Sequence, residues 1–455
     1  MKEKLAGIVG GLSVDYADLR YEENRKTRIS FKGEQLVEVA TYETSGGHVR
    51  AFHAGGKAVA SFSDPSRAGS MAEAVSASAA IAGGRRQKPL RLAEAPVITN
   101  SFPIRCDNDL RSVSFQEKLD LTTHYNRMIL GEKEIATVET NYDEFVSRRI
   151  FVNSEGTLVE YEIVLANILG FIVSKRGDVM QRVRFAFGGD ADFARIRGRD
   201  EDLKQRIVFA QQLLDAEPAK AGLFPVILDP SESGLFIHEA FGHLSEADGL
   251  QNNPAFREKL QIGAPLGKPI LNVYDDPSLP EHPGTYVVDD EGVLGVRTEL
   301  ITDGVLSGRL HSRETAAEFG EPLSGNMRAV GETYTPVVRM SNIGMNPGTD
   351  TFDDMVASID HGYYLVGAKG GQTSGDQFTF GAQWGYMIEN GKLGSMVRDI
   401  NMSGELFSTL QRISMVGDQT EGSERGGCGK AGQMNRLSGK DTPPIKIDQV
   451  TIGGV

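Results

Sequence analysis

Cysteine is nearly absent from this sequence, since Cys106 and Cys428 are the only two among 455 residues. So few cysteines exclude a disulfide framework and suit a reducing compartment. Apolar residues never continue for the roughly 18 positions that suggest a membrane-spanning helix. The short apolar run near the N-terminus is followed by acids and by no A-x-A-like cleavage site. We therefore expect a cytoplasmic protein with no signal peptide and no membrane partner.

Positive charge is also in deficit. The chain has 48 lysines and arginines against 62 acidic residues, which leaves a formal net charge of −14. A field of this sign repels the phosphates of DNA and RNA, so we expect no nucleic-acid partner. The 40% hydrophobic and 24% charged content is that of a globular protein, and 455 residues exceed one ordinary core.

Changes in composition and in hydrophobic pattern along the chain predict its division into domains. The predicted regions are an N-terminal α+β domain (1–84), a linker (85–113), a central α+β region (114–220) and a larger, strand-rich C-terminal domain (221–455). Strand-rich runs bracketed by helices, without regular βαβ alternation, indicate an α+β fold with mixed or antiparallel sheets.

Local signals place the elements within this division. Short alternating segments in 15–63 predict five strands separated by turns at Lys32-Gly33, Gly46-Gly47 and Gly55. Four or five further strands are expected between 136 and 188. The predicted helices cover 67–82, 115–131 with Ser114 as its N-cap, and 200–216.

One segment resembles a metal-binding helix with an extra residue: G-L-F-I-H-E-A-F-G-H-L-S-E-A-D, residues 234–248. The usual zinc pattern H-E-x-x-H separates its histidines by four positions, whereas His238 and His243 are five apart. In a straight helix this spacing turns the two side chains roughly 140° apart. A π-bulge would restore a common face, and Gly242 would ease that distortion. The other interpretation is an ordinary helical Glu239–His243 pair, with His238 in the core.

A zinc site of this kind needs a third protein ligand while one position stays open for water. Glu246 and Asp248 follow closely and could serve as ligands or as carboxylates that orient a histidine. Cys428 lies in G-G-C-G-K, where flanking glycines leave the sulfur accessible and Arg425 and Lys430 would favour a thiolate. A lone cysteine is more often a small core residue, which is our interpretation of Cys106.

Two other features have simple structural interpretations. Asp289-Asp290-Glu291 could bind a hard cation, but D-E-G between alternating runs is more typical of a hairpin turn. His48 and His53 flank one predicted strand and are expected to lie on the surface or to pack in the core. The glycine-rich segments 367–376 and 421–433 are predicted to be loops.

The motif at 234–248 resembles the H-E-x-x-x-H motif of the TldD/PmbA family, in its TldD-like metallopeptidase branch. The resemblance extends over nearly the whole chain. Further similar segments, in the family's order, are residues 16–29, V-D-D-E-G-V (288–293), L-I-T-D-G-V-L (300–306), S-G-N-M-R (324–328), R-M-S-N (339–342), I-E-N-G-K (388–392) and G-G-C-G-K-A-G-Q (426–433). Departures are Phe241, where the family often has a small aliphatic residue, and Ala329, where it often has a polar one.

The resemblance implies a zinc peptidase that hydrolyses unfolded or flexible peptides. It assigns His238, His243 and Cys428 as ligands of Zn²⁺ and Glu239 as general base. It also implies a dimer, either with a PmbA-like sister subunit or with itself. Arg328, Arg339 or amides of 367–376 could stabilise an oxyanion, although structural roles are the more common ones for such arginines.

Two alternatives stay open. The chain could be a non-catalytic peptide-binding or regulatory subunit whose metal is structural or absent. It could also be a metal-dependent hydrolase of small-molecule amides.

Overall fold

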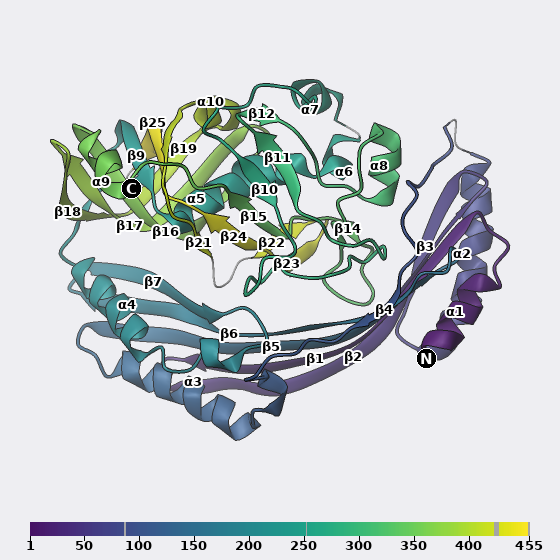
Figure 1. The fold of residues 1–455 in the computed structure, drawn as a ribbon. Helices are drawn as coiled ribbons and strands as arrows, with labels where there is room; N and C mark the ends of the chain where they lie inside the picture. Colours follow the sequence, from purple (N-terminus) through teal and green to yellow (C-terminus); the bar gives the residue numbers. More distant parts are fainter. Residues whose placement is uncertain (86–87, 252, 423–426, 454–455) are drawn as a thin grey trace.

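A long curved sheet, named the large sheet, forms one layer of the molecule, and the C-terminal half of the chain lies on its concave side (Figure 1). The computed structural model describes residues 1–85, 88–251, 253–422 and 427–453. Among these residues, no helix combines the length and the apolar character needed to cross a membrane.

The curved sheet contains seven strands in the order β3-β2-β1-β5-β6-β4, with β7 also paired to β6. Its strands are β1 (Tyr16–Lys32), β2 (Gln35–His53), β3 (Gly56–Phe62), β4 (Thr99–Phe102), β5 (Ile135–Asn153), β6 (Leu158–Arg176) and β7 (Val179–Gly188). All neighbours are antiparallel except β4 and β6. The sheet therefore joins the region before the predicted linker to the region after it, while the predicted domain boundaries stay predictions.

The strands are longer and fewer than predicted. The five segments expected in 15–63 form three strands, and the four or five expected between 136 and 188 also form three. Gly46 and Gly47 lie inside β2 and do not form a turn. A Cβ atom would lie 2.6 Å from the Phe62 carbonyl oxygen at Gly46 and 2.4 Å from the Phe62 ring at Gly47. These glycines permit close approach within a strand, a use that the sequence alone does not distinguish from a turn.

Four helices pack on this sheet at its two ends. They are α1 (Lys2–Gly10), α2 (Ala68–Gly83), α3 (Phe115–Leu130) and α4 (Asp200–Gln212). The predicted cap is present, because the Ser114 side chain accepts a hydrogen bond from the Glu117 amide. Helix α2 packs on β2 and β3, α3 on β5, and α4 on β6 and β7. Short 3₁₀ turns η1 (Pro65–Arg67), η2 (Leu110–Ser112) and η3 (Phe193–Arg195) connect these elements.

A six-stranded sheet and an eight-stranded sheet build the C-terminal half. The first has the order β12-β11-β10-β15-β24-β21, from β10 (Val273–Asp275), β11 (Thr298–Thr302), β12 (Val305–Leu306), β15 (Asn342–Met345), β21 (Glu421–Gly422) and β24 (Gly439–Thr442). The second has the order β16-β9-β25-β19-β17-β18-β8, from β8 (Glu217–Pro218), β9 (Gly222–Leu228), β16 (His361–Ser374), β17 (Gln377–Glu389), β18 (Lys392–Arg398), β19 (Ile400–Glu405) and β25 (Ile445–Gly453), with β20 (Ile413–Val416) on β25. The β16–β17 pairing closes five of its strands into a ring.

Two hairpins and several short helices complete this half. The hairpins pair β13 (Met327–Arg328) with β14 (Val337–Val338) and β22 (Gly427–Lys430) with β23 (Gln433–Leu437). The helices are α5 (Pro230–Ile237), η4 (His238–Gly242), η5 (His243–Ser245), α6 (Ala247–Leu250), α7 (Pro254–Lys259), α8 (Arg313–Phe319), α9 (Phe352–Ala357) and α10 (Leu406–Gln411). The segments 367–376 and 421–433, predicted to be loops, thus contain strands of β16, β21, β22 and β23.

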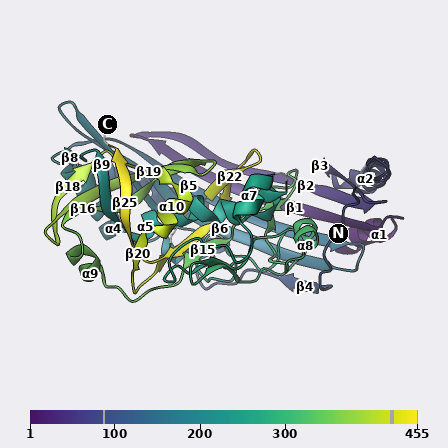
Figure 2. The ribbon, with the colours of Figure 1, turned by 90° about the horizontal axis from the view of Figure 1, so that it is seen from above.

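The two layers share packing as well as connectivity. Trp384 of β17 is buried in the core that the large sheet forms with α3 and α4. Its ring stacks on that of Phe209 of α4, with the ring centroids 4.6 Å apart. The view from above shows that the end of the large sheet carrying α1 and α2 extends beyond the C-terminal half (Figure 2). The predicted α+β fold with mixed and antiparallel sheets is confirmed.

Candidate metal centre

The motif lies where a buried strand leads into a helix. Strand β9 ends at Leu228, and Asp229 caps α5 by accepting a hydrogen bond from the Glu232 amide at 2.8 Å. Pro230 occupies the first turn, where a missing amide hydrogen costs nothing. The helix is buried in the C-terminal core through Phe236 and Ile237, which fixes the position of the next turn.

That next turn is a π-helix, His238–Gly242, and a 3₁₀ turn, His243–Ser245, follows it. One extra residue is thereby accommodated, and the predicted irregularity near Gly242 is confirmed. The imidazole rings of His238 and His243 lie with centroids 5.1 Å apart at an interplanar angle of 90°. The two histidines therefore share a face and do not diverge as they would in a straight helix.

Glycine is required at position 242 by packing against the strand region that follows β14. A Cβ atom there would lie 2.1 Å from the Met340 sulfur and 2.8 Å from Cδ1 of Ile343. Both neighbours are buried. The absence of a side chain at Gly242 lets the wide turn approach Met340 and Ile343 closely.

Cys428 approaches the same point from the β22–β23 hairpin, nearly 200 residues further along the chain. One ligand atom each from His238, His243 and Cys428 lies within 4.8 Å of the others. Two imidazole nitrogens and one thiolate form a donor set suited to zinc. The other cysteine, Cys106, donates to the Ala191 carbonyl at 3.4 Å and packs against the core below the large sheet, as expected for a structural residue.

His243 is oriented by the carboxylate three residues later. Its Nδ1 lies 3.1 Å from Oε2 of Glu246, which leaves Nε2 for the cluster. Burial lowers the pKa of His243, but hydrogen bonds to Cys428 and Glu246 outweigh it and raise the pKa to about 10. His238 is buried, and burial followed by repulsion from His243 holds its pKa well below the usual value.

These protonation preferences fit a metal ion. His238 is held neutral, as a ligand must be, and its Nδ1 is a buried nitrogen without a hydrogen-bond partner among the described residues. His243 and Cys428 share a proton in their hydrogen bond, and a bound cation would replace that proton. The residues present therefore fit zinc on the geometry and chemistry of their donors.

The Cys428 sulfur is contacted by an arginine. Nη2 of Arg339 lies 2.8 Å from the Cys428 sulfur and donates to its carbonyl oxygen at 2.6 Å. Burial raises the pKa of Cys428, but the His243 hydrogen bond and the charge of Arg339 outweigh it, so that the pKa is lowered overall. Lys430, which was expected to favour the thiolate together with Arg425, bonds Glu246 through its Nζ at 2.8 Å. Arg425 lies outside the described residues.

Glu246 and Asp248 belong to this support and not to the three-atom cluster. Lys430 bridges them, with its second contact to Oδ1 of Asp248 at 2.6 Å. Glu246 is buried, and Asp248 also accepts a hydrogen bond from the Val338 amide. The two carboxylates and the lysine together fix the ring of His243.

Glu239 is half-buried beside the cluster. Burial raises its pKa, while the charges of His243 and Lys440 act in the opposite direction. Thr373 of β16 donates to the Glu239 carbonyl oxygen at 3.5 Å and joins this turn to the neighbouring strand. The interaction of the Glu239 carboxylate with the charge of His243 shows that it lies near the second histidine.

Both candidate oxyanion arginines are engaged elsewhere. Arg328 donates to the carbonyl oxygens of Met340 and Leu437 at 2.5 and 2.8 Å, and Arg339 holds Cys428. Each is buried. Their observed role is to fix the hairpin that carries the thiolate.

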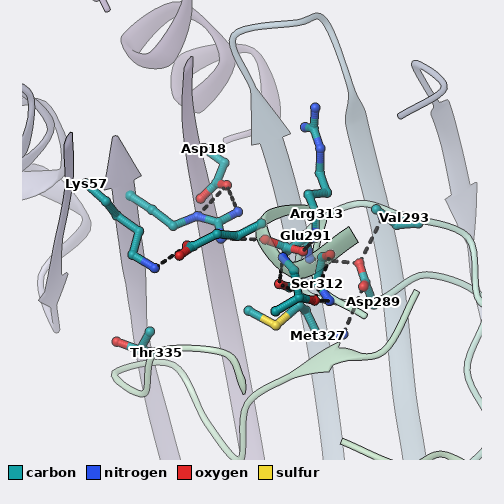
Figure 3. Close-up of polar contacts among 12 residues, drawn as sticks. Asp18, Lys57, Asp289, Glu291, Val293, Ser312, Arg313, Met327 and Thr335 are labelled. Atoms are coloured by element: carbon teal, nitrogen blue, oxygen red, sulfur yellow. Dashed lines mark hydrogen bonds and ion pairs between the residues drawn. The ribbon is translucent and has the colours of Figure 1, made fainter. Parts of the chain in front are cut away.

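The acidic segment Asp289–Glu291 forms a turn whose carboxylates pair with arginines of the large sheet. Arg149 donates to Oδ1 of Asp290 at 2.9 Å, and Arg50 donates to Glu291 at 2.5 Å. Arg50 also donates to Asp18 of β1, so that one guanidinium joins Asp18 to Glu291, and Asp289 accepts hydrogen bonds from the Val293 and Met327 amides (Figure 3). The turn prediction is thus correct, and its role in joining the layers was missed because Arg50 and Glu291 are 241 positions apart.

Family models match three successive parts of the chain. Models described as PmbA/TldA metallopeptidase domain 1, central domain and C-terminal domain match residues 17–82, 108–215 and 221–454.

Related proteins and structures cover between 69% and 100% of the chain. A metalloprotease of Synechocystis is 34% identical over 97% of this chain and 95% of its own. A zinc metalloprotease TldD homolog of Saccharolobus solfataricus is 34% identical over 69% of this chain and 70% of its own. The structure of TldE from Thermococcus kodakarensis has the same fold, with a TM-score of 0.77 at 18% identity, over 100% of this chain and 98% of that one. The chain belongs to the PmbA/TldD family of metallopeptidases.

Proposed function

We propose that this metallopeptidase is a zinc-dependent enzyme that hydrolyses unfolded or flexible peptides. The observation that carries the proposal is the convergence of one atom each from His238, His243 and Cys428 within 4.8 Å. The convergence depends on the wide turn at His238–Gly242, and Glu239 lies on that same turn.

In this proposal His238, His243 and Cys428 hold Zn²⁺, and Glu246 and Arg339 fix the second histidine and the thiolate. When bound, the ion would lower the pKa of water towards about 7 and polarise the scissile carbonyl. Glu239 takes a proton from the attacking water and passes it to the leaving amine. Its burial raises its pKa and brings it nearer the working pH, which favours both transfers.

The shape of the surroundings supports a flexible substrate. A cavity of about 720 Å³ lies between the concave face of the large sheet and the C-terminal half, bounded by Phe145, Tyr286, Gly432 and Met434 among others. The β22–β23 hairpin, which carries Cys428, also borders this cavity through Gly432, Met434 and Leu437, so an extended chain lying in the cavity would pass beside that hairpin. Strands around the site could bind the peptide as an added strand through main-chain hydrogen bonds. Equal cleavage of folded proteins and unstructured peptides of matching sequence would argue against this mode.

We also propose that the working enzyme is a cytoplasmic dimer, with a PmbA-like sister subunit or with a second copy of itself. The likeness to TldE and the TldD names of relatives support such a pairing. Cys106 and Cys428 are both free thiols, which suits a reducing compartment.

The decisive variant is Glu239→Gln, which keeps size and hydrogen bonding but removes the base. We expect it to retain zinc while cleavage of an unstructured peptide falls by about 10²- to 10⁴-fold, because general-base catalysis contributes about that much. Zinc content and peptide cleavage are measured on the same preparations, with and without a sister subunit. Unchanged cleavage would contradict the assigned base. Bound peptide with no cleavage by the wild type would favour the non-catalytic alternative.

A further inference from the structure

One wall of the cavity of about 720 Å³ is apolar. We name it the apolar wall, and its side chains are those of Phe145 in β5, Leu165 in β6, Met434 in β23, and Tyr286. Phe145, Tyr286 and Met434 belong to none of the hydrophobic cores found among the described residues. Apolar side chains that line a cavity and serve no core are typical contacts of a bound ligand.

Strand geometry places two of these side chains on the concave face of the large sheet. Phe145 and Leu165 are directly opposite each other in the β5–β6 register, so they share one face. Their sequence neighbours Val146, Val164 and Ala166 point the other way, into the core with α3 and α4. The sheet therefore presents an apolar cross-strand pair to the cavity.

The apolar wall ends beside the metal centre. Met434 is 67% exposed, and its sulfur packs against Gly429, where a Cβ atom would lie 2.5 Å from it. Gly429 directly follows Cys428. The Tyr286 hydroxyl donates to the Gly325 carbonyl oxygen at 2.8 Å, which holds the ring of that tyrosine in place. A side chain that contacts Met434 therefore lies next to the hairpin that carries the thiolate.

Charged residues also line the cavity, but they are engaged with other residues. Nε of Arg28 lies 3.2 Å from the Glu38 carboxylate, and Glu144 accepts a hydrogen bond from Lys118 at 2.5 Å. The ammonium of Lys26 lies 5.5 Å from the centroid of an aromatic ring of the apolar wall. These contacts compensate charges of the lining, so apolar contact is what the cavity adds for a bound chain.

A second cavity, of about 630 Å³, continues the first. Both cavities are lined by Ile163, Leu165, Pro283, Thr285 and Tyr286. The shared section thus contains two residues of the apolar wall. A chain that contacts the wall can extend into either cavity, which suits an internal residue of a peptide better than a compact molecule.

We propose that the apolar wall binds a large apolar side chain of the peptide substrate, so that the enzyme selects peptides with a leucine or an aromatic residue near the cleaved bond. This inference rests on the proposed peptidase function, and it adds a preference that the metal centre itself does not impose. Methionine is flexible and adapts to side chains of different shape, so we expect leucine and phenylalanine to be accepted alike.

Binding to the zinc-loaded Glu239→Gln protein tests the proposal without turnover. The probes are fluorescein-labelled serine–glycine peptides, amidated at the C-terminus, with a single central leucine, phenylalanine or asparagine. We expect the leucine and phenylalanine peptides to bind about tenfold more tightly than the asparagine peptide by fluorescence anisotropy, because the wall removes apolar surface from water. Equal affinity for the three peptides, or no binding of any of them, would overturn the proposal.

Substitutions link that preference to the apolar wall. Met434→Gln keeps the length of the side chain but makes it polar, and Phe145→Thr removes the ring from a strand position that threonine suits. Each should reduce the preference, the double variant should abolish it, and Met434→Leu should retain it. Met180→Gln, which alters an exposed methionine of β7 outside the cavity, is the matched control and should leave the preference unchanged. A preference that survives the double substitution, or that Met180→Gln reduces equally, would contradict the assignment.

Wild-type cleavage separates this inference from the proposed function. We expect the leucine and phenylalanine peptides to be cut at one fixed distance from the apolar residue, as identified by mass spectrometry of the products. Cleavage of all three peptides with equal kcat/KM supports the peptidase and overturns the apolar preference. Selective binding of the leucine and phenylalanine peptides without any cleavage supports the role of the apolar wall and contradicts the peptidase.

Discussion

Arg339 illustrates how one side chain can control another. Its guanidinium contacts both the carbonyl oxygen and the sulfur of Cys428, whereas Lys430, closer in sequence, is occupied by Glu246. The sequence could place Cys428 near cations, but not decide which cation faces the sulfur. His238, Glu239 and His243 were predictable because they belong to one local motif. The pairing of Arg339 with Cys428 was not, since it depends on contacts between elements 89 positions apart.

Loss of the Arg339 charge should make the Cys428 thiol harder to ionise. In zinc-free protein on a Cys106→Ala background, Arg339→Gln is expected to shift iodoacetamide alkylation of Cys428 to higher pH, because the cation helps to lower the thiol pKa. The measurement is the alkylation rate as a function of pH. Arg297→Gln, a partly exposed arginine of the same half, is the control. An unchanged pH profile in Arg339→Gln would show that the contact does not stabilise the thiolate.

At the scale of elements, the π-turn His238–Gly242 was predictable because helical geometry leaves few ways to bring two histidines five apart onto one face. Strand boundaries were harder to predict from the sequence. Gly46 and Gly47 carry a turn signal, yet they lie inside β2 because Phe62 occupies the space of a side chain. A glycine pair indicates that the positions have no room for side chains, but the sequence does not show whether a turn or a neighbouring strand is the cause.

The fit of this turn predicts the effect of Gly242→Ala. The added Cβ would overlap Met340 and Ile343, so we expect a loss of about 1–3 kcal/mol in the free energy of unfolding, together with weaker zinc binding. Urea unfolding and zinc titration provide the measurements. Gly249→Ala in α6, where a Cβ meets nothing within 4 Å, should change stability by less than about 0.5 kcal/mol. Equal effects of the two substitutions would show that the close packing of the turn is unimportant.

At the scale of the whole molecule, buried charges join the large sheet to the C-terminal half. His48 of β2 belongs to this interface, with Nε2 3.1 Å from Oγ1 of Thr335. Burial, and then the charges of Arg20 and Arg50, lower its pKa to about 3. The sequence left open whether His48 lies on the surface or in the core, and its burial and its cationic neighbours became visible only once the two layers were placed together.

This histidine predicts an acid-sensitive term in stability. The folded protein keeps His48 neutral, whereas the unfolded chain binds a proton below its ordinary pKa of 6.5. Its contribution is therefore complete above pH 6.5 and is lost as the pH falls toward 3. Between pH 7.5 and 5.5, the free energy of unfolding of the wild type should fall by about 1 kcal/mol more than that of His48→Gln. Urea unfolding at both pH values checks this, and a pH-independent difference between the two proteins would contradict it.

The central claim is that two histidines of an irregular helix and a distant cysteine hold one zinc ion. X-ray absorption at the zinc edge of the purified, zinc-loaded protein measures the ligands directly. The account predicts one sulfur at about 2.3 Å and two imidazole nitrogens at about 2.0 Å, with the sulfur lost in Cys428→Ser. A zinc shell of nitrogen and oxygen alone in the wild type, or a sulfur that remains in Cys428→Ser, would contradict it.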